Sequence, residues 1–477
     1  MKLIVKVPPS RLTERRYVLD VVLGEWLGID YEVVPVEGES VFIGLADAPD
    51  SHVLTLADAL LASSPDDWLT TRSMPMLPLA RVRGGLAGSP PNHASGAEDD
   101  PIQILFGAPG PDGRAWARTD TGLETSVDLL GGIFFMLSRY EELVRRVRDS
   151  HDRFPVAASV AFQEDFVGRP IVDEYVELLW WGLSSLWPGL ERKRSVFRLR
   201  LTHDVDYAWA AVGRPRMAVA RSLLGDLIRR RDVGLAASRV HAIIDAGAGR
   251  VDHDPYNTFD FLMTESESLG TSSTFYFQAR PSGRYGSQYR LMDPQIQRLM
   301  RTIHDRGHEI GLHPSYESHG SLERTLQEFD DLRSACHAVG VDQPSWGARQ
   351  HYLRFEAPTT WRILDQASFA HDSTVGFAEL IGFRAGTCRE FPVFDLLNGE
   401  SLRIRERPLL VMDATLLTYM SLGLDDAVSR AGAIADVCRE QEGDATILYH
   451  NHTLHTRRVR DHYRALLQRV GQAPPRT

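Results

Sequence analysis

The chain has 477 residues, of which 43% are hydrophobic and 25% are charged, and its formal net charge is −11. This composition is ordinary for a globular protein, and the length predicts two or three domains. An acidic balance lacks the basic surface that attracts nucleic acid or anionic membranes, so neither is expected as a partner.

The cysteines and the N-terminal residues indicate the cellular compartment of the protein. Cys336, Cys388 and Cys438 are far apart and form no CxxC pair, so neither a disulfide framework nor a cysteine zinc site is expected. The first ten residues lack the apolar core of a secretory signal. No apolar stretch is long enough to cross a bilayer. These features predict a cytoplasmic protein without a membrane span.

Residues 1–190 are predicted to form an N-terminal α/β domain of unknown role. The stretch 84–100 is rich in Gly, Pro, Ser and acidic residues and is predicted to be an exposed loop. The charged run 191–194 marks the predicted domain boundary. The elements expected in this domain are a strand over 41–44 and helices over 16–27, 133–142 and 173–187.

From residue 196 onward strands and helices alternate, which predicts a second domain over 196–470 with a mainly parallel sheet or barrel. Phe197, Leu199 and Leu201 alternate with arginines, the pattern of a half-buried strand. Residues 208–255 are long for a connection and are expected to form a helical insertion near the site. The other expected elements are strands over 274–277, 309–312, 390–394, 409–412 and 446–449 and helices over 293–306 and 322–338.

Several predicted strands end in polar or ionisable residues. Asp204 and Asp206 follow the first strand, two positions apart, so their side chains start on the same side. Two such carboxylates are costly unless a cation or a shared proton relieves the repulsion. The pair indicates a metal site or an acid–base site, with a simple turn as the alternative. The other strand ends carry His313, Asp395, Asp413, His450, Asn451 and His452. In a parallel β/α barrel such ends meet at one face, where active sites form.

Five segments of the second half resemble the motifs of one known family. They read Thr-His-Asp-Val-Asp at 202–206, Gly-His-Glu-Ile-Gly-Leu-His-Pro-Ser-Tyr at 307–316, Arg-Gln-His-Tyr at 349–352, His-Asp-Ser-Thr at 371–374 and Ile-Leu-Tyr-His at 447–450. In this order they resemble the polysaccharide deacetylases, carbohydrate esterase family four with its NodB-homology domain. The resemblance implies an α/β fold with a distorted or partial (β/α) barrel.

The first half resembles an uncharacterised domain that precedes one subgroup of these deacetylase-like proteins. The segments that carry this resemblance are 137–142, 152–154 and 169–170, and the later runs 311–316, 349–352 and 383–387 recur in the same subgroup. The resemblance therefore spans nearly the whole chain. It indicates a fold more securely than a reaction, because function depends on the site.

The resemblance also implies a separate role in catalysis or metal binding for each of several residues. Asp204 would be the general base that activates water, and Arg349 would orient it. Asp206 and His313 would bind a divalent metal, expected to be zinc, that polarises the substrate carbonyl. His450 would be the general acid that protonates the leaving amine.

One position departs from the family pattern. The family's second metal histidine lies four residues after the first, where this chain has Glu317, and the next histidine is His319. The third ligand is therefore expected to be His319 or Glu317. The remaining alternative is that neither binds and the metal is weak or absent.

Further residues are candidates for substrate binding. Tyr316 and Tyr352 could stack on sugar faces, although tyrosines also pack in cores. Asp372 could support the site or could cap a helix. His452 could contact substrate or be an ordinary satisfied histidine.

The implied activity is metal-dependent removal of an N-acetyl or other acyl group from a sugar or glycan precursor. The altered second motif keeps open a non-catalytic protein that binds a glycan or a glycan-biosynthesis partner. Glycoside hydrolysis is disfavoured, because Asp204 and Asp206 are close in sequence and the two carboxyl groups would need roughly 5 Å or more between them. The oligomeric state leaves no signal in the sequence.

Overall fold

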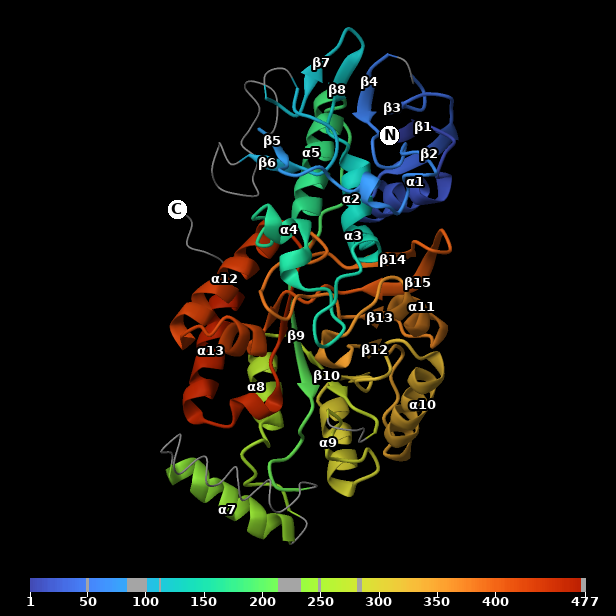
Figure 1. Ribbon diagram of the computed structural model, residues 1–477. Helices are drawn as coiled ribbons and strands as arrows, with labels where there is room; N and C mark the ends of the chain where they lie inside the picture. The colour runs from blue at the N-terminus through green and yellow to red at the C-terminus, as the bar shows by residue number, and fades with distance from the viewer. Residues whose placement is uncertain are drawn as a thin grey trace.

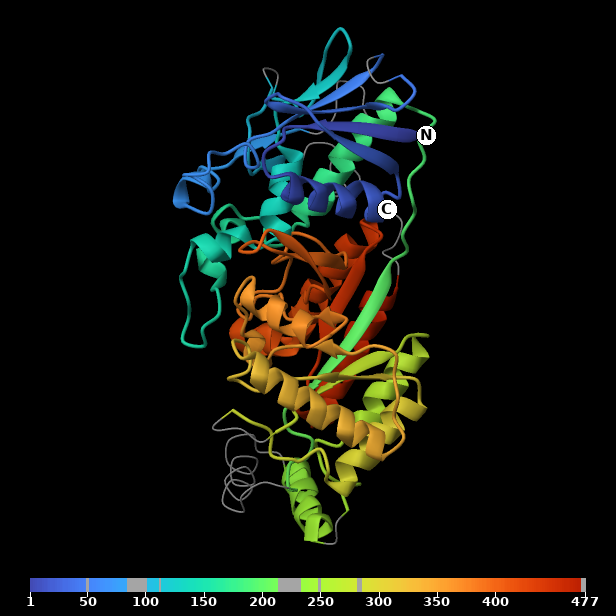
Figure 2. The ribbon, with the colours of Figure 1, turned by 90° about the vertical axis from the view of Figure 1, so that its right-hand side faces the viewer.

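The computed structural model describes residues 1–48, 51–83, 101–110, 113–212, 233–247, 250–280 and 285–472. The loop predicted over 84–100 lies outside these residues, as does part of the insertion predicted over 208–255. Figures 1 and 2 show the N-terminal sheet at one end of the molecule, a larger sheet in the middle and α7 (Val233–Gly247) at the other end. Within the described ranges, no helix combines the length and apolarity needed to cross a bilayer.

The N-terminal half is built on a six-stranded sheet with the order β2-β1-β3-β4-β8-β7. Leu3, Val5 and Val7 are buried on one face of β1, as the alternating pattern of a half-buried strand requires. The strands are β1 (Lys2–Val7), β2 (Asp30–Pro35), β3 (Ser40–Leu45), β4 (Val53–Ala57), β7 (Ala117–Arg118) and β8 (Gly122–Thr125), with a separate pair of β5 (Ala80–Val82) and β6 (Ile102–Ile104).

The helices of this half differ in detail from the sequence prediction. The helix predicted over 16–27 is α1 (Leu12–Leu19), which continues into the π-helical η1 (Asp20–Trp26). The single helix predicted over 133–142 is wrong, because Arg139 adopts a left-handed backbone with φ 54° and breaks it. The remaining elements are η2 (Thr71–Ser73), α2 (Leu129–Leu137), α3 (Tyr140–Val144), η3 (Val156–Ala158), α4 (Val160–Gln163) and α5 (Ile171–Leu186).

The second half contains a nine-stranded sheet with the order β14-β15-β13-β12-β11-β10-β9-β17-β16. All neighbours in it are parallel except β14 and β15. The strands are β9 (Arg198–Val205), β10 (Ser273–Phe277), β11 (Glu309–Leu312), β12 (Gly347–Ala348), β13 (His371–Asp372), β14 (Phe391–Asp395), β15 (Glu400–Glu406), β16 (Val411–Met412) and β17 (Asp444–Leu448).

This strand order is that of a β/α barrel that does not close. From β9 the parallel strands follow the chain through β10, β11, β12 and β13 to β15, and β17 and β16 continue on the other side of β9. Among the described residues the edge strands β14 and β16 are not paired, so the barrel is open between them. The α/β fold with a distorted or partial barrel is therefore confirmed.

Helices cover the outside of this sheet. The predicted helices 293–306 and 322–338 are confirmed as α9 and α10, and in α9 Ile296, Leu299, Met300 and Ile303 are buried at helical spacing. The helices are α8 (Phe259–Ser268), α9 (Pro294–Asp305), α10 (Leu322–Ala338), α11 (Thr359–Gln366), α12 (Leu424–Glu440) and α13 (Arg457–Gly471), with short turns η5 (His351–Leu353), η6 (Thr415–Tyr419) and η7 (Asn451–Leu454).

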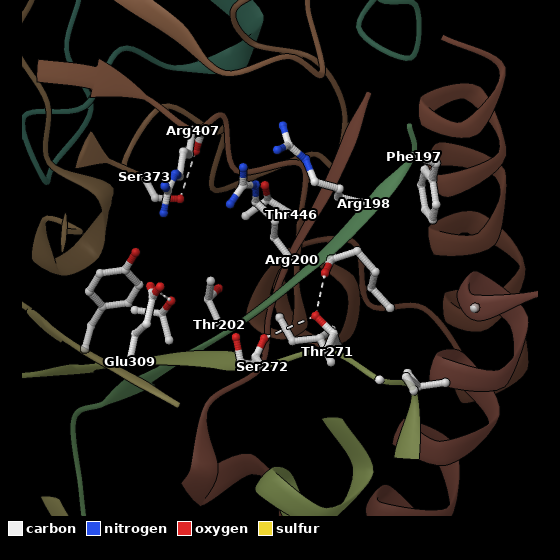
Figure 3. A pocket seen from close by; sticks show the side chains of 17 residues that line it. Phe197, Arg198, Arg200, Thr202, Thr271, Ser272, Glu309, Ser373, Arg407 and Thr446 are labelled. Atoms are coloured by element: carbon white, nitrogen blue, oxygen red, sulfur yellow. Dashed lines mark hydrogen bonds between the residues drawn. The ribbon is translucent and has the colours of Figure 1, made fainter. Parts of the chain in front are cut away.

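The amino-terminal end of the barrel interior holds a cavity of about 440 Å³ (Figure 3). Arg200 on β9 pairs with Asp444 at 2.6 Å and with Glu390 at 3.3 Å, and Arg407 pairs with Glu390 at 2.7 Å. Because each of these guanidinium groups has a carboxylate partner, the network braces the base of the barrel. The chemistry-bearing residues lie at the opposite, carboxyl ends of the strands.

Candidate metal centre and active site

A second cavity, of about 380 Å³, lies at the carboxyl ends of the parallel strands. Its size falls in the range of small-molecule sites. Its lining includes Asp204, Asp206, His313, His351, Tyr352, Asp413, His450 and His452. Side chains from β9, β11, β12, β16 and β17 therefore meet where the sequence predicted a site.

Three of these side chains form a compact group that could hold a metal ion: Asp206, His313 and His351. Asp206 Oδ1 lies 3.3 Å from His313 Nε2 and 3.3 Å from His351 Nδ1. The two imidazole nitrogens are 2.9 Å apart. Ligands of one ion bound at about 2.1 Å would be separated by about 3.0 Å at octahedral and about 3.4 Å at tetrahedral angles. The observed separations match this range.

The hydrogen bonds on the far side of each imidazole fix its tautomer. His313 Nδ1 lies 2.5 Å from the carbonyl oxygen of Arg349, and His351 Nε2 lies 2.8 Å from that of Tyr285. A carbonyl only accepts, so both of these nitrogens donate. In the neutral rings, His313 Nε2 and His351 Nδ1 are then lone pairs that face each other and a carboxylate. The Gln278 amide nitrogen is a donor beside this group, 3.2 Å from Asp206 Oδ1 and 3.3 Å from His351 Nδ1. A cation would satisfy the remaining lone pairs, and far-side carbonyls commonly orient metal-binding histidines in this way.

The electrostatics of the group fit a metal. Burial lowers the pKa of His351 to about 4, which keeps its imidazole in the neutral form that binds metals. Burial opposes ionisation of Asp206, but His351, His313 and His450 hold the pKa of its carboxyl well below its usual range. Burial opposes protonation of His313, but Asp204 and Asp206 raise the pKa of its imidazole, so the acidic side chains attract a cation to this nitrogen. With His313 deprotonated, two imidazole nitrogens and one carboxylate oxygen are ligands that suit zinc and other divalent transition metals.

His351 occupies a short turn, η5, directly after β12. The next two residues, Tyr352 and Leu353, have left-handed backbones with φ of 62° and 55°. Such strain in non-glycine residues persists only where the surroundings over-determine it, and it clusters at functional sites. The sequence analysis did not propose His351 as a ligand. The available signal was a histidine two positions after Arg349, close to the end of a short strand.

Asp204 is held by a buried arginine. Arg349 Nη1 donates to Asp204 Oδ1 at 3.1 Å and to Thr202 Oγ1 at 2.8 Å. Its other nitrogens donate to the carbonyl and the hydroxyl of Ser373, both at 2.8 Å. The opposite oxygen, Asp204 Oδ2, lies 3.7 Å from His313 Nε2. Asp204 therefore keeps one oxygen anchored and presents the other to the metal group.

His450 is paired with Asp413, the residue that follows β16. The His450 Nδ1 lies 2.7 Å from Asp413 Oδ1, and its backbone N–H donates to Oδ2 at 3.0 Å. Burial opposes protonation, but Asp413 and then Asp206 raise the pKa of His450 to about 10. The free nitrogen, Nε2, is 3.6 Å from Asp206 Oδ2. The sequence placed Asp413 at a strand end, and in the structure it lies in the cavity wall.

Glu317 and His319 do not join the metal group. Glu317 is about half exposed and its carboxylate pairs with Arg324 at 3.3 Å. His319 is half-buried, and burial and Arg354 lower the pKa of its imidazole. The turn after β12 instead brings His351 to the position beside Asp206 and His313, where His319 or Glu317 was expected.

The four candidates for substrate binding separate into two pairs. Tyr352 and His452 line the cavity. Tyr316 is not in its lining, and its ring stacks on Tyr285 at 4.5 Å. Asp372 is buried outside the lining, where its carboxyl accepts from Thr374, and burial raises its pKa to about 6.

Solved structures with a distant likeness cover more than half of the chain. A protein from Mycobacterium smegmatis assigned as a polysaccharide deacetylase has 15% identity and a TM-score of 0.37, over 58% of this chain and 85% of its own. PuuE allantoinase has 12% identity and a TM-score of 0.37, over 59% and 85%. A family 4 carbohydrate esterase from Streptomyces lividans has 12% identity and a TM-score of 0.27, over 58% and 87%.

Comparisons by sequence give a match in the N-terminal half. No curated protein matches the chain significantly. Residues 3–188 match the model of a family of unknown function, DUF7033.

Proposed function

We propose that the chain is a metal-dependent hydrolase that removes an N-acetyl or other acyl group from a sugar or glycan precursor. The observation that carries the proposal is the group of three facing acceptors, His313 Nε2, His351 Nδ1 and an Asp206 oxygen, beside a second carboxylate. A divalent metal there, zinc by the proposal, would polarise the acyl carbonyl and lower the pKa of a bound water.

The chain's own residues supply the proton transfers. Asp204 takes a proton from the attacking water through its free oxygen, while Arg349 holds the other oxygen. His450 donates a proton from Nε2 to the leaving amine, because Asp413 fixes the ring through Nδ1. The amine is a poor leaving group until its nitrogen is protonated, so base and acid are both required. The cavity of about 380 Å³ has room for one sugar ring with its acyl group.

The direct test is acetate release from a panel of N-acetylated sugars, with metal analysis of the same preparations. In Asp204→Asn we expect kcat to fall by about 10²–10⁴-fold, the usual contribution of a general base, with metal content unchanged. Loss of metal together with activity would instead make Asp204 a ligand.

A second variant tests the proposed role of His450 as the general acid. Asp413→Asn keeps the volume of the side chain but removes the charge that faces His450 Nδ1. We expect kcat to fall by about 10²-fold or more, with metal binding retained, because the ring loses its orientation and its proton affinity. Asp395→Asn is the matched control, since Asp395 also ends a strand but pairs with Arg362 away from the cavity. Equal loss in both variants would contradict the assignment.

The alternative is a non-catalytic protein that binds a glycan or a glycan-biosynthesis partner. Metal-loaded protein that binds N-acetylated sugars without releasing acetate would favour it. A new reducing end without acetate would point to glycoside hydrolysis instead.

A further inference from the structure

A segment of the N-terminal half reaches the edge of the metal centre. Residues 149–154, here called the arm, lie in the connection between α3 and α4, which runs beside the second half in both views (Figures 1 and 2). The arm is internally braced, because Asp149 Oδ1 accepts from the backbone N–H groups of His151 at 2.8 Å and Arg153 at 2.9 Å. It therefore presents a defined surface to the rest of the protein.

The arm contacts the turn that carries His351. Arg354, three residues after His351, donates from Nε to the carbonyl of His151 at 3.0 Å and from Nη2 to Asp152 Oδ2 at 2.8 Å. Arg153 donates from Nη1 to the carbonyl of Tyr352 at 3.3 Å. Three successive arm residues thus bind the two residues that flank Leu353.

Aromatic contacts reinforce these bonds. The His151 ring lies 4.7 Å from the Tyr352 ring at an interplanar angle of 32°, and its Nδ1 is 3.0 Å from the Tyr316 hydroxyl. Arg354 in turn lies 4.0 Å over the Tyr316 ring. The turn after β12 is therefore held on its outer side by the N-terminal half and on its inner side by the carbonyl of Tyr285.

The left-handed backbones of Tyr352 and Leu353 make this support necessary. Two consecutive non-glycine residues in that region are strained, and the strain persists only if the packing around them enforces it. The arm supplies bonds on both sides of Leu353. If it were released, the turn could relax toward ordinary backbone angles and carry His351 Nδ1 away from Asp206 and His313.

We propose that the arm is a positioning element of the metal centre, which holds the His351 turn so that metal affinity depends on the N-terminal half. The part of this inference that concerns metal rests on the proposed function, whereas the part that concerns the turn does not. It gives the N-terminal half a role at the site, through residues that do not themselves bind the metal.

The test uses the full chain and a double variant, His151→Ala with Asp152→Asn, which removes the ring contact and one ion pair. Asn suits the positive φ of 59° at position 152. The matched control is Glu25→Gln, which breaks another ion pair between the two halves, that of Glu25 with Arg405. Metal dissociation constants are measured by chelator competition, and hydrogen exchange is followed in peptides that contain residues 350–354.

In the double variant we expect metal affinity to fall about 10-fold, the scale of changes in groups that orient ligands. Exchange over residues 350–354 should become faster, and both quantities should be unchanged in Glu25→Gln. Unaltered affinity and exchange in the double variant would overturn the proposal. If the wild-type chain binds no metal, the proposed function fails, and the exchange result alone decides whether the arm holds the turn.

Discussion

Replacement of His351 with alanine is expected to weaken divalent-metal binding by more than about 100-fold, beyond the loss typical of residues that only orient ligands. The physical reason is that His313 and Asp206 would then face an ion with two protein ligands in place of three. Acetate release should be lost to a similar degree. Isothermal titration of metal-free protein with zinc, followed by metal analysis after dialysis, measures the effect.

Two control variants, one of a histidine and one of a carboxylate, accompany this experiment. His319→Ala and Glu317→Gln alter the residues that the family pattern places at the third ligand position, but neither side chain joins the metal group. Both variants should bind zinc as the wild type does. Weaker binding in either one, with His351→Ala unaffected, would restore the assignment made from the sequence.

Glu142→Gln is expected to destabilise the protein by about 3–5 kcal/mol, because it leaves buried arginine charge uncompensated. Glu142 on α3 pairs with Arg384 at 2.7 Å and with Arg139 at 2.9 Å, and all three side chains are at most 1% exposed. The free energy of unfolding, from urea titration followed by circular dichroism, measures the loss. Asp305→Asn breaks an exposed pair with Arg301 and should cost about 1 kcal/mol or less.

The contribution of Glu142 to the free energy of unfolding is expected to depend on pH. Burial opposes the charge of Glu142, but Arg384 and Arg139 lower its pKa to about 2 from an ordinary value of 4.5. A folded-state pKa below the unfolded one contributes stability that is complete above about pH 4.5 and is lost as the pH falls toward 2. The stability difference between wild type and Glu142→Gln should therefore shrink over that interval. A difference that stays constant would contradict the ionised pair.

The sequence predicted the elements whose patterns are local. Helix α10 and strand β11 have the predicted bounds, because their apolar spacing and the glycines that follow α9 and α10 are visible in one short window. Strand β15 was not predicted, since four of its seven residues are Glu or Arg and only its neighbours β13 and β14 make it a strand. Pairing between distant segments decides such cases.

The residues of the candidate site also differ in whether a local pattern could reveal them. Asp204 lies at the end of β9, and Asp206, His313 and His450 come soon after strands, so they could be found because parallel strands share an end. His351 could not be identified as a ligand, because its position depends on the left-handed turn at Tyr352 and Leu353 and on a carbonyl from Tyr285. Neither leaves a pattern in the residues around it.

The open barrel has an edge strand, and the N-terminal half covers it. Among the described residues β14 pairs only with β15, so one side of its backbone lacks a strand partner. Tyr17 of α1 donates from its hydroxyl to the carbonyl of Pro392 at 2.8 Å, and its ring packs 5.0 Å from that of Phe394. An uncovered edge of this kind is a template for association with other chains. The N-terminal half thus protects the sheet from self-association. The second half on its own would expose the edge strand β14, which could then pair with another chain.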